Sequence, residues 1–377
     1  MKVLRIITRL NVGGPSIQAL KLLDYFNQGE DESVLVTGIC SEGERSIDRS
    51  MYAEKREWIY EMPELHRDIS PLKDSIALFK LWRLIRREKP HVVHTHLSKA
   101  GMLGRLAAWL CGVPMIVHTY HGHTFHSYFS PFKTRFFVWI EKVLLRLSSA
   151  IICISPLQKK EICEVLGNSA KARVIPLGFD LKKFAIKGAG SLHEEMGLPK
   201  STKIIATIGR LTAIKNQALF IELAQLFAND PAYFFVIIGE GEMGSELLAQ
   251  IHHLGLQNIR VFPYRNDLGS VYRSLYALVM TSKNEGTPVV AIEALASGCP
   301  VVAPQVGGIP DVIQDGVSGF LVPGWEVALY QTAVLNLPTL DPQKFQKACE
   351  QVLKDYDFNV LATRLEHLYQ SKRGLLT

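Results

Sequence analysis

The sequence predicts an α/β protein built from two parallel sheets flanked by helices. Short apolar runs of strand length alternate with amphipathic helical stretches, a pattern typical of parallel sheets. This alternation occurs in two successive series, the first from residue 2 to 180 and the second from residue 203 to 304. A chain of 377 residues with 47% hydrophobic content is long enough to form two such domains.

The apolar runs place the expected strands along the chain. In the first series these are residues 2–8, 33–39, 91–97, 114–120, 150–155 and 173–180. In the second series they are residues 203–211, 233–241, 258–264, 277–282 and 300–304. The stretch 181–200 is turn-rich and weakly patterned, and we expect it to be the linker. We therefore predict an N-terminal domain over 1–182, a C-terminal domain over 183–356 and a terminal amphipathic helix over 357–377.

Positive charge is concentrated in the N-terminal half. Residues 1–180 hold 25 Lys and Arg against 18 Asp and Glu, whereas the remaining residues hold 17 against 18. Much of the excess lies in 80–90 and 132–147, where cations alternate with aromatic and aliphatic residues. Such segments can rest on an anionic membrane surface, but ordinary amphipathic helices with one solvated face have the same composition. Because no nucleic-acid motif is present and the basicity is moderate, we expect no nucleic-acid partner.

The expected location of the protein follows from the length of its apolar runs. These runs are short and strand-like, and the first residues, MKVLRIITRL, read as a strand without a cleavable signal pattern. The six cysteines show no paired short spacing, which favours free thiols over disulfides or a zinc site. We expect a cytoplasmic protein, peripheral on the inner face of the cytoplasmic membrane if the basic segments contact lipid.

The segment 284–302 carries the strongest functional pattern. It places Glu285 and Glu293 eight positions apart around the start of a short expected helix, with Thr287 able to cap that helix. The free backbone N–H groups at such a helix start bind anions, and Glu293 then lies roughly one sugar ring from the bound phosphate. This spacing suits a nucleotide sugar. The alternative is a core helix that carries two solvated glutamates.

Two cations extend this pattern. Arg210 follows an expected strand directly, and Lys215 comes five positions later. A departing diphosphate must be neutralised as a glycosidic bond breaks, and cations at a strand end can supply that charge. The alternative is a pair of surface cations.

Five pieces of the sequence form a recognisable series along almost the full chain. They are Val12-Gly13-Gly14; HTHLSKAGMLGRLAA (94–108) with TYHGHTF (119–125); IPLGFD (175–180); GRLTAIKNQ (209–217); and the segment 284–302 followed by Gly307-Gly308-Ile309-Pro310-Asp311. In this order, the pieces resemble the retaining glycosyltransferases of family 4. The resemblance implies the GT-B fold, in which two Rossmann-like domains face a central cleft, with a last helix that crosses back to the N-terminal domain.

The resemblance also implies roles for individual residues. Glu293 binds the ribose hydroxyls, Glu285 the hydroxyls of the transferred sugar, Arg210 and Lys215 the diphosphate, and His121 the donor sugar. A structural role for His121, and turn or core roles for the glycines, are the alternatives. The remaining expected donor-binding residues are Gly13, Gly14, Gly239, Gly241, Phe262, Tyr264, Arg265, Gly286, Thr287, Val289 and Val290.

A metal site must be weighed because histidines cluster in the N-terminal half. His118, His121, His123 and His126 fall within nine residues, and three more histidines crowd the preceding strand. The cluster lacks the spacing of a helical zinc motif. The Asp-Tyr-Asp triplet at 355–357 spells a metal-binding pattern of another glycosyltransferase fold, but it lies at the start of the terminal helix, where a capping role fits better. We expect no metal and no cofactor.

The function that the resemblance implies is a retaining, metal-independent transfer of a hexosyl or N-acetylhexosaminyl group. The expected donor is a nucleoside diphosphate sugar, with UDP favoured by its frequency in the family, and the expected acceptor is a lipid-linked saccharide. This places the protein in the synthesis of a cell-surface polysaccharide or glycolipid. Two alternatives remain: a sugar-nucleotide epimerase of the same architecture, and a non-catalytic nucleotide-sugar-binding module.

Overall fold

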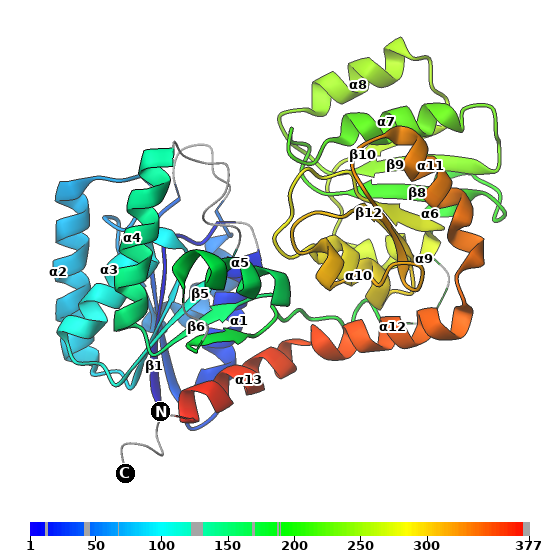
Figure 1. The fold of residues 1–377 in the computed structure, drawn as a ribbon. Coiled ribbons are helices and arrows are strands. Elements are labelled where there is room, and N and C mark those ends of the chain that lie inside the picture. The colour runs from blue at the N-terminus through cyan, green and yellow to red at the C-terminus, as the bar shows by residue number, and fades with distance from the viewer. Residues whose placement is uncertain are drawn as a thin grey trace. The chain divides into compact units, whose positions relative to one another are not determined.

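The fold comes from a computed structural model that describes residues 1–11, 14–40, 46–66, 68–121, 131–167, 170–186, 188 and 190–371. The chain forms two compact units (Figure 1). Unit 1 comprises Met1–Gly178 and Asn359–Thr377, and unit 2 comprises Phe179–Phe358. The division between Gly178 and Phe179 lies four residues before the predicted boundary at 182, and the C-terminal segment from Asn359 belongs to unit 1.

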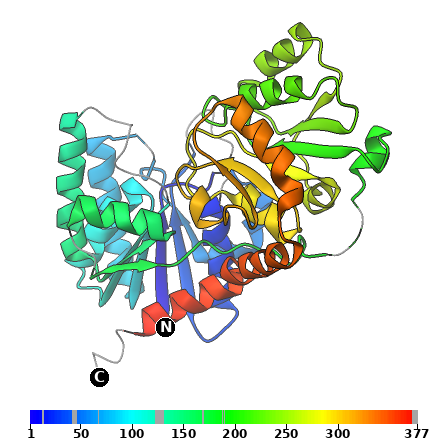
Figure 2. The same ribbon diagram turned by 45° about the vertical axis from the view of Figure 1, so that its right-hand side comes forward.

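Unit 1 contains a parallel sheet of seven strands in the order β3-β2-β1-β4-β5-β6-β7. The strands are short, and the five between the edge strands β3 and β7 are almost entirely buried, as expected for a parallel sheet covered on both faces (Figure 2). They are β1 (Lys2–Ile7), β2 (Glu32–Thr37), β3 (Ile59–Glu61), β4 (Val92–His96), β5 (Met115–Tyr120), β6 (Ala150–Cys153) and β7 (Ala172–Val174).

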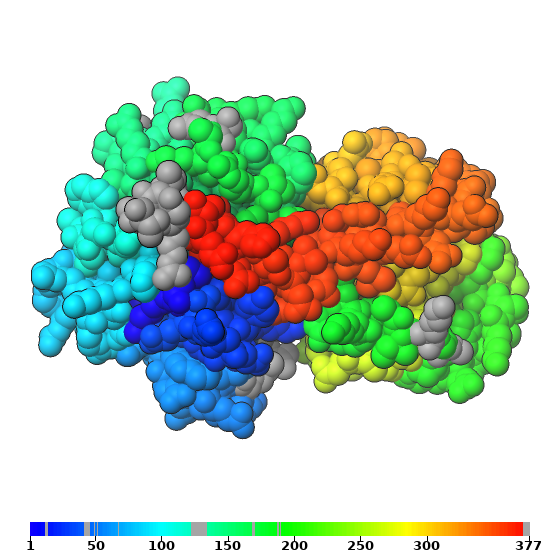
Figure 3. Space-filling model, turned by 90° about the horizontal axis from the view of Figure 1, so that it is seen from below, coloured from blue at the N-terminus to red at the C-terminus, as the bar shows by residue number. Residues whose placement is uncertain are grey.

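The helices of unit 1 cover the two faces of its sheet. Leu4 and Ile6 of β1 pack against α2 (Pro71–Glu88) and α3 (Ser98–Leu110), and α4 (Pro131–Leu147) packs beside α3. The alternate residues, Arg5 and Ile7, face α1 (Gly14–Asn27), because successive side chains of a strand point to opposite faces. The last helix, α13 (Phe358–Gln370), packs on this second face, where Figure 3 shows it (red) against the first elements of the unit (blue).

Unit 2 contains a parallel sheet of six strands in the order β10-β9-β8-β11-β12-β13. Its strands are β8 (Lys203–Ile208), β9 (Tyr233–Ile238), β10 (Ile259–Phe262), β11 (Ala277–Val279), β12 (Val301–Pro304) and β13 (Gly319–Val322). One face is covered by α7 (Gln217–Leu226), α8 (Gly244–His253) and α11 (Val327–Asn336). The other is covered by α6 (Leu192–Met196), α9 (Leu268–Ser274), α10 (Val289–Ala296) and α12 (Pro342–Asp355).

Local sequence signals explain several helix ends. The helix α5 (Pro156–Leu166) begins after Ser155, whose hydroxyl accepts a hydrogen bond from the Gln158 N–H, and ends at Gly167 with a φ of 76°. Asp341 caps α12 in the same way, accepting hydrogen bonds from two backbone N–H groups. The described residues also form the 3₁₀ segments η1 (Arg49–Trp58), η2 (Ile309–Asp311) and η3 (Leu337–Thr339).

Two sequence expectations differ from the structure. The predicted linker over 181–200 is wrong, because Leu181, Phe184, Leu192 and Met196 are buried in the core of unit 2. The short strands β3 and β13 were not expected, since runs of three and four residues are too brief to show a clear strand period. The other eleven strands coincide with expected apolar runs.

Candidate active site

The first group of expected site residues lies where the strand order of unit 2 reverses. The chain runs outward from β8 toward β9 and β10 on one side, and from β11 toward β12 and β13 on the other. In open α/β sheets, ligands bind at this reversal, beyond the carboxyl ends of the strands. Arg210 follows β8, and the loop that contains Glu285 follows β11, so both positions belong to this edge.

Lys215 and Glu285 form an ion pair at this edge. The Lys215 Nζ lies 2.5 Å from Glu285 Oε1, and the Ser282 hydroxyl donates to the same oxygen at 2.6 Å. The Thr281 hydroxyl donates to the Lys215 carbonyl at 3.0 Å, which fixes the lysine backbone against the loop after β11. Glu285 is only 9% exposed, and these partners offset the free-energy cost of burying its carboxylate.

Arg210 differs from Lys215 in having no fixed partner. Its side chain is exposed, and no described residue forms a hydrogen bond or ion pair with its guanidinium. Its backbone carbonyl is held by the Gln217 side chain at 2.8 Å, so the residue is anchored while its charge stays available. An anchored, unpaired cation is suited to binding a phosphate.

Close backbone contacts explain the glycines around the site. A Cβ on Gly307 would lie 1.9 Å from the Glu285 carbonyl oxygen, and the Gly308 N–H donates to that same oxygen at 3.0 Å. On the other side, a Cβ on Gly239 would lie 1.9 Å from the Gly209 carbonyl oxygen, and one on Gly241 would lie 2.2 Å from that of Leu211. These glycines let neighbouring loops touch, and a direct role of Gly239 and Gly241 in donor binding stays a prediction.

The start of α10 differs from the expectation. Thr287 was expected to cap the helix, but the N-cap is Pro288 and no side chain caps it. The chain turns more tightly than expected here, and the Val289 N–H donates to the Thr287 carbonyl at 2.9 Å. Gly286 and Thr287 lie in the loop before the helix, and Val290 follows in its first turn.

Glu293 lies on α10 and contacts the neighbouring helix α9. The Tyr272 hydroxyl donates to Glu293 Oε2 at 3.1 Å. Burial raises the pKa of the Glu293 carboxyl, and the Tyr272 hydrogen bond acts in the opposite direction. The carboxylate is thus held in place with one oxygen that Tyr272 does not bind, an arrangement that suits ribose hydroxyls.

The segment expected at the nucleotide base follows β10. Phe262 ends that strand, and its carbonyl accepts a hydrogen bond from the Gly239 N–H at 3.0 Å. Tyr264 is 60% exposed. Arg265 forms ion pairs with Glu195 at 2.6 Å and Asp267 at 2.7 Å, and these carboxylates raise its pKa. Its guanidinium is therefore engaged within unit 2.

The histidines of unit 1 form a connected chain at the ends of β4 and β5. His121 Nε2 lies 2.9 Å from His96 Nδ1, and the rings of His96 and His94 lie 4.3 Å apart. His94 is bonded on both ring nitrogens, to the Thr119 hydroxyl at 2.7 Å and to the Tyr369 hydroxyl of α13 at 2.6 Å. The chain of contacts thus links the C-terminal helix to His121.

Burial keeps these imidazoles neutral. It lowers the pKa of His121 to about 4, and it lowers the pKa values of His94 and His96 well below the usual range. Two neutral rings share one proton in the His96–His121 hydrogen bond, so one donates and the other accepts. No described residue binds His121 Nδ1, which leaves that nitrogen for a ligand.

Other expected residues lie outside this description or apart from it. Gly13, His123 and His126 fall outside the described residues, and Gly14 is the first residue of α1. Within the described ranges, no group of three His, Cys, Asp or Glu side chains is arranged to hold a metal ion. Asp355 ends α12, where Gln351 donates to it at 2.8 Å.

Sequence reasoning missed the residues that support the site. Ser282 and Tyr272 hold the two glutamates, and Tyr369 holds His94 of the histidine chain. Ser282 lies in the same loop as Glu285, three residues before it, so its position gave a local signal. Tyr272 and Tyr369 come from other elements, and only the fold brings them to their partners.

The sequence is similar to those of known glycosyltransferases. Residues 12–183 match the model of Glycosyltransferase Family 4, and residues 190–337 match that of Glycosyl transferases group 1. The UDP-Gal:alpha-D-GlcNAc-diphosphoundecaprenol alpha-1,3-galactosyltransferase of Escherichia coli is 32% identical over 80% of this chain and 79% of its own. A D-inositol 3-phosphate glycosyltransferase of Actinosynnema mirum is 31% identical over 66% of each chain.

Solved structures share the fold. The crystal structure of Anabaena Alr3699/HepE in complex with UDP has a TM-score of 0.80 and 19% identity, over 98% of this chain and all of that one. Two parallel-sheet α/β units and this likeness show the GT-B fold. The family matches and the Escherichia coli relative together show that this chain belongs to the family 4 glycosyltransferases.

Proposed function

We propose that the protein transfers a hexosyl group from a UDP-sugar to a lipid-linked saccharide, with retention of configuration and without a metal ion. The observation that carries this proposal is the Lys215–Glu285 ion pair at the strand reversal of unit 2, next in sequence to the unpaired Arg210. Arg210 and Lys215 supply cations that can bind a diphosphate, and Glu285 supplies a carboxylate that can bind sugar hydroxyls.

The charges of these residues explain how the donor is held. Arg210 binds the diphosphate first, since its guanidinium has no competing described partner. Lys215 is then shared between the diphosphate and Glu285, while the second oxygen of Glu285 accepts from a sugar hydroxyl. As the glycosidic bond breaks, negative charge grows on the diphosphate, and two positioned cations stabilise it. This is the role that a metal ion has in other transferases.

The relatives support the donor and acceptor classes. The name of the Escherichia coli relative gives UDP-Gal as donor, a GlcNAc linked to diphosphoundecaprenol as acceptor and an α-1,3 linkage in the product. The neighbouring Anabaena structure contains UDP. We infer a UDP-hexose donor, and an acceptor in which an N-acetylhexosamine is joined through a diphosphate to a lipid. The α linkage is consistent with retention.

A lipid-linked acceptor requires contact with a membrane, and unit 1 has a suitable surface. Among the described residues, no helix is both long and apolar enough to cross a bilayer. On α2, exposed apolar residues and cations recur at spacings of three and four and thus share one face. The helices α2 and α4 both pack against α3, and exposed apolar and basic residues recur on α4 as well. We call these exposed residues of the two helices together the α2–α4 surface: Leu72, Ile76, Phe79, Arg83, Arg86, Arg135, Phe136, Trp139, Lys142, Val143 and Arg146.

The α2–α4 surface has the composition of an interfacial membrane contact. Phe136 is 54% exposed and Trp139 is 61% exposed, and the two rings stack with centroids 6.3 Å apart. Exposed cations accompany them on α4 and continue the apolar face of α2. Aromatic side chains enter the headgroup region while cations attract anionic lipid. We propose that this surface binds the cytoplasmic face of the membrane.

Vesicle flotation tests the membrane contact. The double variant Phe136→Ser/Trp139→Ser should lose binding to vesicles that contain anionic lipid, and Arg83→Glu/Arg86→Glu should lose it in a salt-dependent manner. Leu335→Ser, at a 50% exposed position on α11 of unit 2, is the matched control and should float like wild type. Equal flotation of all four proteins would show that the α2–α4 surface is an ordinary solvated face.

Ligand binding and transfer test the central proposal. UDP should raise the unfolding temperature more than GDP or ADP, because a ligand at 100 times its dissociation constant adds about 2.7 kcal/mol of stability. Incubation with UDP-hexoses and a lipid diphosphate-linked N-acetylhexosamine should then give a glycosylated lipid. Conversion of the donor to an isomer without acceptor would favour the epimerase alternative. Binding of UDP-sugars with transfer to no acceptor would favour a binding module.

A further inference from the structure

Unit 1 contains a cavity at the amino ends of β4 and β5, which we call the β4–β5 cavity. It has a volume of about 350 Å³, in the lower part of the range of small-molecule sites, about 300–1,000 Å³. His91, directly before β4, and Pro114, directly before β5, both line it. His121 follows the carboxyl end of β5, so the β4–β5 cavity lies at the opposite end of these strands and is a separate feature.

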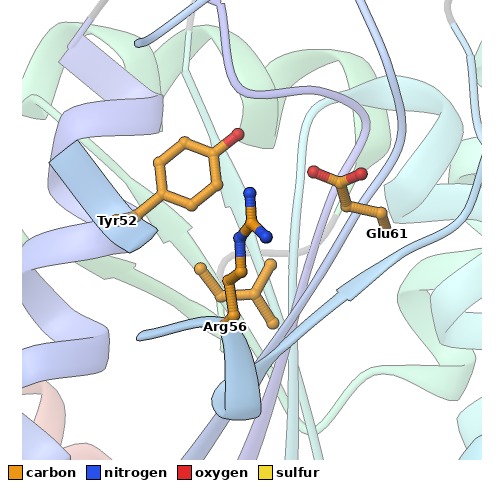
Figure 4. Close-up of a pocket in the computed structure, with 4 residues that line it drawn as sticks. Tyr52, Arg56 and Glu61 are labelled. Atoms are coloured by element: carbon orange, nitrogen blue, oxygen red, sulfur yellow. The ribbon is translucent and has the colours of Figure 1, made fainter. Parts of the chain in front are cut away.

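The charge of the β4–β5 cavity has one sign. The described residues that line it include Arg86, Lys89 and His91 and no Asp or Glu. Another cavity of unit 1 differs in this respect, because Arg56 and Glu61, a cation and a carboxylate, both line it (Figure 4). The field in the β4–β5 cavity is therefore positive and attracts an anion.

The two permanent cations of the cavity have no bound acceptor. No described residue forms a hydrogen bond or ion pair with the Arg86 guanidinium or the Lys89 ammonium group. Arg86 lies over the Trp82 ring, 5.0 Å from its centroid, in a cation–π contact that uses no N–H hydrogen bond. Glu88, between the two cations in sequence, is bonded instead to the Lys2 ammonium group at 2.8 Å. Both cations can thus bind an anionic ligand.

His91 adds a neutral hydrogen-bond donor. The Lys2 backbone N–H donates to His91 Nδ1 at 3.0 Å, so Nδ1 is the unprotonated ring nitrogen and Nε2 carries the hydrogen. No described residue accepts a hydrogen bond from Nε2. An imidazole N–H beside a guanidinium and an ammonium group is a suitable donor set for the oxygens of a phosphate.

Lys89 is held in a backbone conformation that favours glycine. It ends α2 with a φ of 46° and a ψ of 53°, in the left-handed region where glycine is the usual residue. Its N–H donates to the Ile85 carbonyl at 2.9 Å, and the next residue, Pro90, is buried. A lysine is less stable than glycine in this conformation, and a ligand for its ammonium group would offset that cost.

The end of α3 brings exposed apolar side chains to the rim of the cavity. Trp109 and Leu110 are 54% and 52% exposed, and the next residue, Cys111, lines the cavity. The Cys111 thiol donates to the Trp82 carbonyl at 3.5 Å, which joins the ends of α2 and α3. Exposed tryptophan and leucine beside cations are typical of a contact with lipid headgroups.

The β4–β5 cavity also adjoins the α2–α4 surface. Arg86 belongs to both, and the Trp82 ring that it contacts stacks on Phe79 with centroids 5.8 Å apart. Phe79 is 59% exposed. A soluble anion in the cavity would leave these apolar side chains in water, whereas a lipid would cover them with its acyl chains.

We propose that the β4–β5 cavity binds the phosphate of an anionic glycerophospholipid, with Arg86, Lys89 and His91 as hydrogen-bond donors. The ligand chemistry is a phosphate ester, and the exposed apolar rim assigns that ester to a lipid. This proposal rests on the membrane contact of the proposed function and deepens it, because it adds a site for a single headgroup to a general attraction between the α2–α4 surface and anionic lipid.

Calorimetric titration with short-chain lipids below their micellar concentration tests the site. Dihexanoylphosphatidylglycerol should bind wild type, and dihexanoylphosphatidylcholine should bind about tenfold more weakly or less, because the cations repel its choline group. Glycerophosphoglycerol, the same headgroup without acyl chains, should also bind more weakly than the lipid. Equal or tighter binding of this headgroup alone would assign the phosphate to a soluble ligand and overturn the lipid assignment.

Two variants of Lys89 separate binding from stability. Lys89→Gln should weaken the binding of dihexanoylphosphatidylglycerol by about tenfold or more, as expected for loss of a hydrogen bond to a charged group. Lys89→Gly should weaken it as much, while its unfolding temperature stays at or above that of wild type, because glycine suits the φ of 46°. The matched control is Lys73→Gln, which removes one exposed cation from α2 outside the cavity and should keep the Kd within about twofold of wild type.

These titrations contain no vesicles, donor or acceptor. Their outcome therefore does not depend on sugar transfer or on binding of the α2–α4 surface to a bilayer, and a failure of the proposed function would leave the affinities unchanged. Absence of binding to wild type, equal affinity for the two short-chain lipids, or a wild-type Kd in both Lys89 variants would overturn the headgroup site.

Discussion

Removal of Lys215 should affect diphosphate binding and local stability separately. In the donor-free protein, Lys215 Nζ lies 2.5 Å from Glu285 Oε1, and their side chains are 24% and 10% exposed. The variant Lys215→Ala leaves the Glu285 carboxylate with the Ser282 hydroxyl and without its cation. We expect this to lower the free energy of unfolding by about 1.5–3 kcal/mol, the contribution of a hydrogen bond to a charged group.

A second substitution distinguishes the two effects. In Lys215→Ala/Glu285→Gln the neutral amide no longer requires a cation, so part of the lost stability should return, with a coupling of about 0.5–3 kcal/mol. UDP affinity should not return. It should stay roughly 10- to 150-fold below wild type, as expected for about 1.5–3 kcal/mol of lost phosphate interaction. Uridine, which has no phosphate, should bind Lys215→Ala as it binds wild type.

Two measurements give these quantities. Calorimetric titration gives the affinities for UDP and uridine, and urea unfolding followed by tryptophan fluorescence gives stability. Trp325 is the one tryptophan in unit 2, and its indole N–H donates to the Ser282 carbonyl at 3.4 Å, so it reports on this loop. Lys283→Ala, on the same loop with an exposed side chain, is the control. Wild-type UDP affinity in Lys215→Ala, or an equal loss for uridine, would refute the phosphate role.

Three further predictions concern the buried groups. Because burial raises the pKa of Glu293, the folded chain binds the carboxyl proton of Glu293 more tightly than the unfolded chain does. As pH rises through the ordinary carboxyl range, wild type should therefore lose stability relative to Glu293→Gln in parallel urea titrations. Identical pH profiles of stability for the two proteins would contradict the raised pKa. An NMR titration should give His121 a pKa of about 4, rather than the ordinary value of 6.5. Tyr369→Phe removes the hydroxyl bonded to His94 and should lower the free energy of unfolding by about 1 kcal/mol; unchanged stability would contradict this.

Strand positions were largely predictable because buried parallel strands are short continuous apolar runs. The sequence was less informative about 181–200, whose apolar residues are spaced irregularly, and only the fold shows that Leu192 and Met196 enter the core of unit 2. Thr287 failed as a cap because residue type shows which side chains can cap a helix, but not how tightly the preceding loop turns.

The candidate site was predictable where its residues lie close together in the chain. Glu285, Glu293, Arg210 and Lys215 belong to local patterns, and the fold places the loops of Lys215 and Glu285 in contact. The partnership of Tyr369 with His94 joins residues 275 positions apart, and no local pattern can show such a contact. Separation in sequence, rather than residue type, is what limited the prediction.

The anomeric configuration of the product tests the central claim most directly. The protein would be incubated with UDP-galactose, a lipid diphosphate-linked N-acetylglucosamine and excess EDTA, and the new linkage would be assigned by NMR. We predict transfer in the presence of EDTA and a product that keeps the configuration of the donor, because Arg210 and Lys215 supply the charge that stabilises the departing diphosphate. An inverted product, or activity that vanishes with EDTA and returns with Mg²⁺ or Mn²⁺, would contradict the account.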